Sequence, residues 1–209
     1  MNDKFLRIIK KLGVKNKSFL EKKLPKMFFF TDRNRVDDVF AVVKNLPKNS
    51  AIIIREYDLE NSQRLDFARI ISDLARKRSL KVFVGKDIKL AKKIKADGVH
   101  FSDWEGLKSY NNLGKNFLIS YACHSEKSVR RAQKIGCDLI FYSPIFPTKS
   151  HPNQKTIGSL KLRNLTAKAT IPIYALGGID GNNAKILVSS GVGGVGGVSI
   201  FQDNILRKI

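Results

Sequence analysis

Two glycine-rich segments near the C-terminus are the part of the chain whose residue types point most directly to chemistry. Residues 173–179 read IYALGGI and residues 193–200 read GGVGGVSI. Because glycine lacks a Cβ atom, its backbone N–H groups can approach a ligand closely, and a following helix N-terminus favours an anion. The pair predicts a cup for a phosphate group. Tight turns that pack closely for steric reasons are the alternative.

A single arginine closes an otherwise apolar run. Residues 51–54 read AIII, and Arg55 follows them. A guanidinium at the end of a buried strand needs an anionic partner, and its planar fork suits a phosphate group. A pair with the neighbouring Glu56, or with another carboxylate, is the alternative, and the sequence leaves both open.

Two histidines lie near the predicted strand ends. His124 begins a stretch with helical spacing, where it is either an ordinary residue of the first turn or a catalytic group. His151 ends a long polar segment, residues 143–151, that we expect to act as a lid beside a phosphate site. The sequence contains no Ser–His–Asp pattern and no metal-binding histidine spacing.

These residues need a scaffold, and the chain alternates apolar β-type runs with helical patterns. Strands separated by single helices imply parallel pairing through right-handed crossovers, and eight such units predict a single-domain α/β fold, the (β/α)₈ TIM barrel. An open doubly wound sheet is disfavoured because no G-x-G-x-x-G follows the first strand. Residues 1–26 are expected to form a lysine-rich helical extension, and residues 27–209 the barrel domain. The expected strands are Met27–Thr31, Ala51–Arg55, Lys81–Val84, Gly98–Phe101, Phe117–Ser120, Leu139–Ser143, Ile171–Ala175 and Gly194–Ser199.

Composition sets the class of protein. The chain has 209 residues, of which 43% are hydrophobic, and no apolar run reaches the length of roughly 20 residues that a membrane helix requires. The N-terminal residues lack the apolar core of a secretory signal, so we expect a cytoplasmic protein. The net charge of +21 attracts anions. The basic residues are nevertheless spread along the chain and no nucleic-acid motif is present, which favours a solvated lysine surface over a nucleic-acid partner.

Taken together, the strand-end motifs resemble those of the thiamine-phosphate synthase family and its thiazole tautomerase relatives. The resemblance covers nearly the whole chain after Pro25. It implies a (β/α)₈ barrel that joins a pyrimidine diphosphate to a thiazole phosphate, with Mg²⁺ helping the diphosphate to leave. The motifs that carry it are Phe29–Asp32, Ala96–His100, Ser143–Thr148, Ala175–Ile179 and Gly197–Ser199.

The resemblance also implies roles for individual residues. Arg55 corresponds to the arginine that binds the diphosphate, and Thr148 and Ser150 correspond to hydroxyls of the loop after the sixth strand. His151 stands where the family usually has a lysine of that loop. The residues that correspond to the thiazole-phosphate cup are Gly177, Gly178, Val198 and Ser199.

The diphosphate side departs from the family pattern. Ile53 and Tyr57 stand where the family usually has glutamine and lysine, and Gly85-Lys86 stands where it usually has Asn-Asp. The second change replaces a magnesium-binding carboxylate with a cation. Lys86 could place its ammonium near the magnesium position and take over part of the work of the metal.

Two carboxylates remain as candidate magnesium ligands: Asp87, one position further along, and Glu105, which matches the second metal carboxylate. Ala122 replaces a serine of the family, and Pro144 stands where the tautomerases have a histidine, which weakens the tautomerase interpretation. Three hypotheses follow: a thiamine-phosphate synthase, a degenerate relative that only binds a phosphorylated small molecule, and a basic nucleic-acid-associated protein. The sequence indicates no oligomeric state.

Overall fold

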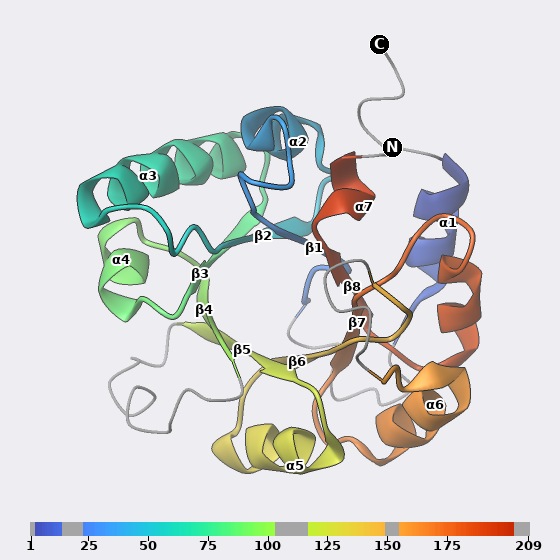
Figure 1. Ribbon diagram of the computed structural model, residues 1–209. Helices are drawn as coiled ribbons and strands as arrows, with labels where there is room; N and C mark the ends of the chain where they lie inside the picture. The colour runs from blue at the N-terminus through green and yellow to red at the C-terminus, as the bar shows by residue number, and fades with distance from the viewer. Residues whose placement is uncertain (1–2, 14–22, 103–116, 149–154, 203–209) are drawn as a thin grey trace.

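The computed structural model is a closed barrel of parallel strands surrounded by helices (Figure 1), and it describes residues 3–13, 23–102, 117–148 and 155–202. The strands follow one another around the barrel in sequence order, and the last one pairs with the first. The strands are β1 (Met27–Phe30), β2 (Ser50–Ile54), β3 (Lys81–Gly85), β4 (Gly98–Phe101), β5 (Leu118–Cys123), β6 (Leu139–Tyr142), β7 (Ile173–Leu176) and β8 (Gly194–Gly197).

Helices cover the outside of the barrel, and side chains at their first turns fix where several of them begin. Asp38 and Asp87 each accept a hydrogen bond from a backbone N–H of the first turn, and Ser125 and Ser128 form a reciprocal capping box. The helices are α1 (Asp3–Lys11), α2 (Val39–Asn45), α3 (Asn61–Lys77), α4 (Ile88–Lys93), α5 (Glu126–Ile135), α6 (Gly158–Lys168), the 3₁₀ helix η3 (Ala184–Ser189) and α7 (Ser199–Gln202).

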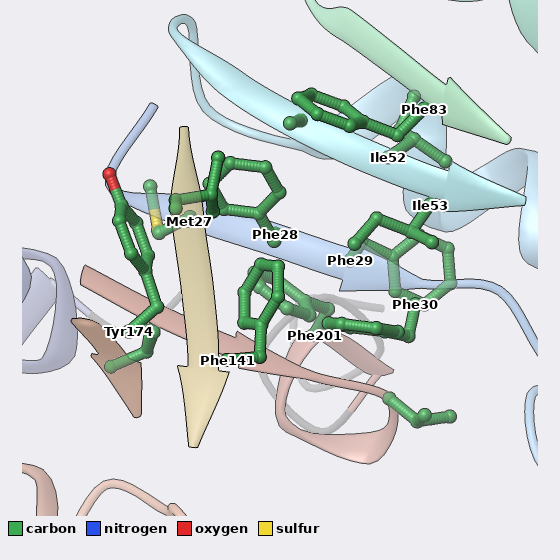
Figure 2. Close-up of a cluster of buried hydrophobic side chains, with 14 of the residues drawn as sticks. Met27, Phe28, Phe29, Phe30, Ile52, Ile53, Phe83, Phe141, Tyr174 and Phe201 are labelled. Atoms are coloured by element: carbon green, nitrogen blue, oxygen red, sulfur yellow. The ribbon is translucent and has the colours of Figure 1, made fainter. Parts of the chain in front are cut away.

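Aromatic rings fill the interior of the barrel (Figure 2). The ring of Phe28 on β1 makes edge contacts with Phe83 on β3, Phe141 on β6 and Tyr174 on β7, at centroid distances of 5.5, 5.0 and 5.2 Å. These strands are not neighbours of β1, so the contacts cross the barrel axis. Such edge-to-face pairs add about 1 kcal/mol each beyond the burial of their surface.

Glycine on β8 makes room for these rings. A Cβ atom on Gly196 would lie 2.7 Å from a ring carbon of Phe30 and 3.0 Å from one of Phe141. Real Cβ atoms do not approach so closely, and the rings are held from several sides. The glycine-rich sequence of β8 is therefore a packing requirement as well as a possible phosphate-binding feature.

The barrel predicted from the sequence is confirmed, and the differences lie at the ends of elements. The strand predicted as Gly98–Phe101 is observed with those bounds, whereas β8 ends at Gly197 instead of Ser199. β5 continues to Cys123, three residues beyond the predicted end, because its last residues pair with β4 and β6.

Helical spacing of the apolar residues predicts that Ile70 and Val188 lie on buried stripes, but both are on the surface. The exposed fractions are 49% for Ile70 on α3 and 40% for Val188 on η3. The segment that holds Val188 forms a 3₁₀ helix, whose side chains repeat every three residues instead of every 3.6. A stripe assigned from α-helical spacing therefore placed Val188 on the wrong face.

The N-terminal helix belongs to the same core as the barrel. Phe5, Ile9 and Leu12 are buried, and α1 packs beside η3 (Figure 1). The Lys26 ammonium donates to the Lys10 and Leu12 carbonyl oxygens at 2.8 and 2.6 Å, which ties the end of α1 to the start of β1. The helix predicted within residues 1–26 is thus present as α1.

Both cysteines are buried thiols. Cys123 on β5 and Cys137 after α5 have exposed fractions of 0% and 2%. The Cys137 thiol donates to the Ala132 carbonyl oxygen at 3.3 Å. Over the part of the chain that the structure describes, no helix is long and apolar enough to cross a membrane.

The packing of β8 gives a stability prediction. Gly196→Ala should lower the free energy of unfolding by about 1–3 kcal/mol, because the added methyl group overlaps the Phe30 and Phe141 rings. Gly181→Ala is the matched control, since a Cβ atom there has no neighbour within 4 Å. Urea denaturation of the three proteins measures the difference, and equal midpoints for both variants would contradict the packing argument.

Candidate active site at the barrel mouth

The carboxyl ends of the eight strands open onto one end of the barrel, and three rings form the floor of this mouth. Phe30, His100 and Phe141 make edge contacts with one another at centroid distances of 5.0 to 5.5 Å. Phe30 and Phe141 are buried, so they fill the barrel beneath the mouth. His100 is the polar member of the floor.

His100 is held neutral. Its Nδ1 atom lies 2.9 Å from the Ser120 hydroxyl, and its side chain is buried. Burial disfavours the charged imidazolium, and the positive charges of Arg55 and Lys86 disfavour it further, so the pKa of His100 falls to about 3. At neutral pH the floor therefore carries no charge of its own. Arg55 and Lys86 follow β2 and β3, which pair with each other.

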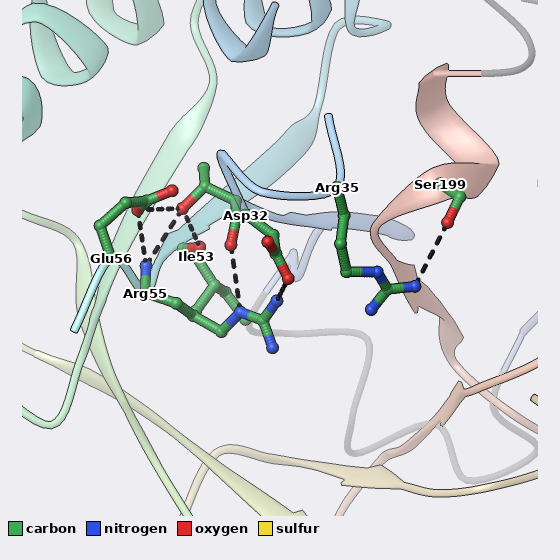
Figure 3. A network of polar contacts seen from close by, with 7 residues as sticks. Asp32, Arg35, Ile53, Arg55, Glu56 and Ser199 are labelled. Carbon is green, nitrogen blue, oxygen red and sulfur yellow. Dashed lines mark hydrogen bonds and ion pairs between the residues drawn. The ribbon is translucent and has the colours of Figure 1, made fainter. Parts of the chain in front are cut away.

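Arg55 follows β2 and is fixed by the residues that follow β1 (Figure 3). Its Nε donates to the Thr31 carbonyl oxygen at 3.1 Å, its Nη2 pairs with the Asp32 carboxylate at 3.1 Å, and its guanidinium lies 5.6 Å from the Phe30 ring centroid. About a third of the side chain is exposed. Among the described residues nothing accepts a hydrogen bond from Nη1, so the guanidinium is positioned with donor capacity left at the mouth.

The Arg55 guanidinium pairs with a carboxylate, which is the alternative raised from the sequence, but the partner is Asp32 and not Glu56. Glu56 is buried and accepts hydrogen bonds from the Thr31 hydroxyl at 2.6 Å and from the Arg55 backbone N–H at 3.2 Å. It holds the turn after β2 in place, and Asp32 carries the ion pair. The sequence showed Asp32 at a strand end but gave no sign of its partner.

Lys86 lies at the end of β3 beside an aromatic ring. Its backbone has a φ of 66°, in the left-handed region, and its N–H donates to the His100 carbonyl oxygen at 2.9 Å. The ammonium lies 5.4 Å from the centroid of the Tyr57 ring, and the Arg64 guanidinium lies 5.3 Å from the same centroid. A cation over an aromatic face is stabilised by the ring quadrupole. We did not anticipate roles for Tyr57 or Arg64.

Asp87, predicted as a magnesium ligand, has its two carboxylate oxygens in use. Oδ1 accepts from the Leu90 backbone N–H at 2.8 Å, which caps α4, and Oδ2 pairs with Arg64 at 3.3 Å. Glu105 lies outside the described residues. The described part of the chain contains no group of three or more His, Cys, Asp or Glu side chains that could hold a metal ion. These residues therefore do not fit a magnesium site by themselves, and both ligands stay predictions.

The two glycine loops lie after β7 and β8. Gly177 and Gly178 have φ values of 92° and 67°, which side chains rarely adopt. A Cβ atom on Gly178 would overlap the carbonyl oxygens of Phe146 and Pro147, so this glycine lets the loop after β6 pack against the loop after β7. At Gly178, close steric packing, which is the alternative raised from the sequence, therefore accounts at least for the choice of glycine.

The backbone N–H groups of these loops remain available for an anion. Within the described ranges, those of Gly178, Val198 and Ser199 donate to no other group of the chain. The carbonyl groups are occupied instead: Gly177 accepts from the Phe146 N–H at 3.2 Å, and Gly178 accepts from the Asn183 amide at 2.7 Å. Free donors and occupied acceptors are what an anion site requires.

Arg35 is a functional candidate that sequence reasoning missed. It lies in the turn after β1, where the Asp32 carbonyl oxygen accepts from the Arg35 and Val36 N–H groups. Its Nη2 lies 3.4 Å from the Ser199 hydroxyl (Figure 3), so a second guanidinium extends toward the β8 loop. The two residues are 164 positions apart, and no local pattern indicates the contact.

The loop after β6 is described only in part. Thr148 lies beside Gly177, because its Cγ2 atom is 3.4 Å from where a Cβ atom of Gly177 would be. Ser150 and His151 lie outside the described residues. His124 contacts the start of this loop, with Nδ1 2.9 Å from the Ser143 carbonyl oxygen and 3.1 Å from the Ser143 hydroxyl.

Comparison with known proteins agrees with this arrangement. The family model described as thiamine monophosphate synthase matches residues 27–201. The chain belongs to that family. Its barrel, its glycine loops and its mouth all fall within the matched region.

Individual relatives cover most of the chain. A protein of Aquifex aeolicus that is assigned as thiamine-phosphate synthase 2 is 32% identical over 86% of this chain and 99% of its own length. The thiamine-phosphate synthase of Bacillus velezensis is 25% identical, covering 84% and 82%. Among solved structures, the thiamine phosphate pyrophosphorylase of Pyrococcus furiosus superposes with a TM-score of 0.77 at 25% identity, over 90% of this chain and 93% of that one.

The neutral His100 gives a pH prediction. The unfolded chain binds a proton at this histidine below its ordinary pKa of 6.5, whereas the folded chain binds one only near pH 3. The folded-state pKa is depressed, so keeping His100 neutral costs no stability above pH 6.5. As the pH falls from 6.5 toward 3, the free energy of unfolding decreases. The loss from this one group approaches about 1.4 kcal/mol per pH unit.

His100→Asn should remove that component. Urea denaturation of both proteins between pH 7 and pH 4 should show the stability of the wild type falling more steeply than that of the variant. Other carboxylates titrate in this range, so the comparison uses the difference between the two curves. Parallel profiles would show that His100 does not titrate as its burial requires.

Proposed function

We propose that the protein is a thiamine-phosphate synthase, which joins hydroxymethylpyrimidine diphosphate to thiazole phosphate and releases diphosphate. The family membership supports this function. The observation that carries it at the level of residues is that one mouth has two cationic side chains at one part of its rim and two glycine loops at another. Arg55 and Lys86 follow β2 and β3, and the glycine loops follow β7 and β8.

The reaction is a displacement at carbon. The thiazole nitrogen forms a bond to the methylene carbon of the pyrimidine, and the bond from that carbon to the diphosphate oxygen breaks. The oxygen leaves with the bonding electron pair, and the thiazole nitrogen becomes positively charged. Such a step depends on stabilising the departing anion and on holding the two partners in line.

Arg55 is suited to stabilise the departing diphosphate. The Asp32 carboxylate, the Thr31 carbonyl oxygen and the Phe30 ring fix its guanidinium before any substrate binds. A donor that is already in position loses little energy to reorganisation when charge develops on the leaving oxygen. Lys86 supplies a second positive charge at the adjacent strand end.

The β7 and β8 loops are suited to hold the thiazole phosphate. The backbone N–H groups of Gly178, Val198 and Ser199 provide fixed dipoles, and Arg35 adds a charge beside the Ser199 hydroxyl. Thr148 borders the same loops. Ser150 and His151 are proposed to complete the site from the loop after β6.

The floor suits the remaining parts of the substrates. Phe30 and Phe141 are buried beneath the position proposed for the heteroaromatic rings, so this side of the site is apolar. The neutral His100 adds no positive charge beneath the thiazolium that forms, so it does not oppose the reaction electrostatically. The family resemblance implies Mg²⁺ as a further countercharge to the diphosphate, and Glu105 is the remaining candidate ligand, because Leu90 and Arg64 engage both oxygens of Asp87.

Arg55→Ala tests this proposal. The change should lower kcat/KM for thiamine phosphate formation by about 100-fold, because it removes one preorganised donor to the leaving group. Arg69→Ala is the matched control, since Arg69 pairs with Asp66 on the exposed face of α3 and should leave activity unchanged. Activity is measured as thiamine phosphate formed from both substrates.

The outcome also separates the proposal from a degenerate relative. A wild-type protein that binds thiazole phosphate by calorimetry, yet forms no thiamine phosphate with or without Mg²⁺, would be a binding protein of this family and not a synthase. Equal kinetics for Arg55→Ala and the wild type would remove Arg55 from the mechanism.

Gly178→Ala tests the phosphate cup. The added methyl group overlaps the Phe146 and Pro147 carbonyl oxygens at a residue whose φ is 67°, so it should displace the loop. The dissociation constant for thiazole phosphate should rise about tenfold, the equivalent of losing one good hydrogen bond to a charged group. Calorimetry measures it, and Gly181→Ala, in the same loop region, should bind as the wild type does.

A further inference from the structure

Three residues at neighbouring strand ends form one interlocked unit. Tyr57 follows β2, Gly85 ends β3, and Lys86 follows Gly85. A Cβ atom on Gly85 would overlap the Tyr57 hydroxyl oxygen and lie 3.0 Å from the Tyr57 Cζ atom. The position of this ring therefore requires glycine at residue 85, and the same ring lies beside the Lys86 ammonium.

Lys86 keeps an unfavourable backbone conformation in this unit. Its φ of 66° lies where a residue with a Cβ atom is strained, and a non-glycine residue there costs about 1 kcal/mol or more. The hydrogen bond from its N–H to the His100 carbonyl oxygen and the contact with Tyr57 hold it there. Strain of this kind, kept by surrounding contacts at a strand end, is typical of functional positions.

Arg64 braces the unit from α3, which lies outside β3 (Figure 1). Its Nη2 donates to the Gly85 carbonyl oxygen at 2.9 Å, its Nη1 pairs with Asp87 at 3.3 Å, and its guanidinium lies 5.3 Å from the Tyr57 ring centroid. The side chain is 11% exposed. These contacts fix both the ring and the β3 loop, and they use the Asp87 oxygen that does not cap α4.

The unit therefore presents positive charge where the family resemblance implies a magnesium-binding carboxylate. Residue 86 is a lysine, and both oxygens of Asp87 are engaged by Leu90 and Arg64. Arg55 follows β2, and β2 pairs with β3, after which Lys86 lies, so the two cationic residues stand at adjacent strand ends. A diphosphate above them would meet an ammonium and a guanidinium at once.

We infer that Lys86 and Arg55 form a metal-independent diphosphate site, in which Tyr57 holds the Lys86 ammonium in place. The identity of the diphosphate as a leaving group rests on the proposed function. In that reaction the two cations donate hydrogen bonds to the departing oxygen as it takes the electron pair of the broken C–O bond. The step needs no co-reactant beyond the two substrates.

Binding of inorganic diphosphate to the full chain, measured by calorimetry in the presence of EDTA, tests the inference. The wild type should bind without metal. Lys86→Gly should weaken binding about tenfold or more, since it removes a charge-assisted hydrogen bond. Glycine is chosen because it accepts the left-handed backbone and so keeps the loop in place.

Two further variants make the test specific. Tyr57→Ala removes the ring and should weaken diphosphate binding. Tyr57→Phe keeps the ring and should bind diphosphate as the wild type does. Lys92→Ala removes an exposed lysine of α4 and should change nothing, which controls for the net charge of +21. Circular dichroism confirms that each variant is folded.

Binding that appears only after Mg²⁺ is added, or equal affinity for Lys86→Gly and the wild type, overturns the inference. The outcome is distinct from that of the proposed function. Metal-free diphosphate binding without thiamine phosphate formation would leave this site in place and reject the synthase. Synthase activity that EDTA abolishes would support the synthase and reject the metal-independent site.

Discussion

Closure of the barrel around an aromatic interior is the constraint on which the rest of the molecule depends. β8 must pair with both β7 and β1, and it can do so only if its residues leave space for rings that reach across the axis. Gly196 provides that space for Phe30 and Phe141. These rings also lie beneath the mouth, so the residues that close the fold form the base of the candidate site as well.

The buried floor also affects the charged side chains of the mouth. A histidine in such surroundings stays neutral, and arginine and lysine can lie nearby only where other groups fix them. Asp32 and the Phe30 ring fix Arg55, while the Tyr57 ring and a backbone hydrogen bond fix Lys86. Each cation is positioned by the chain itself before a substrate arrives, which is the arrangement that electrostatic catalysis requires.

Sequence patterns predicted what repeats along the chain and missed what forms across it. Strand and helix periodicity predicted the barrel, and the glycine pairs and Arg55 lie at strand ends, as the sequence indicated. The partnership of Arg35 with Ser199 joins opposite ends of the chain, and the Arg64–Tyr57 contact joins a helix to a loop. Residue type alone also could not decide between capping and metal binding for Asp87, because a carboxylate serves both. The positions of Ser150, His151 and Glu105 stay predictions.

The two buried thiols allow local unfolding of the protein to be measured. Cys123 ends β5 within the barrel wall, and Cys137 lies under the end of α5, so the two sample different parts of one helix–strand unit. An alkylating reagent reaches either sulfur only when that region opens. The rate at which each cysteine is modified, read by mass spectrometry, therefore measures local opening without any introduced probe. Comparing the two rates shows whether β5 and the end of α5 open together or one after the other.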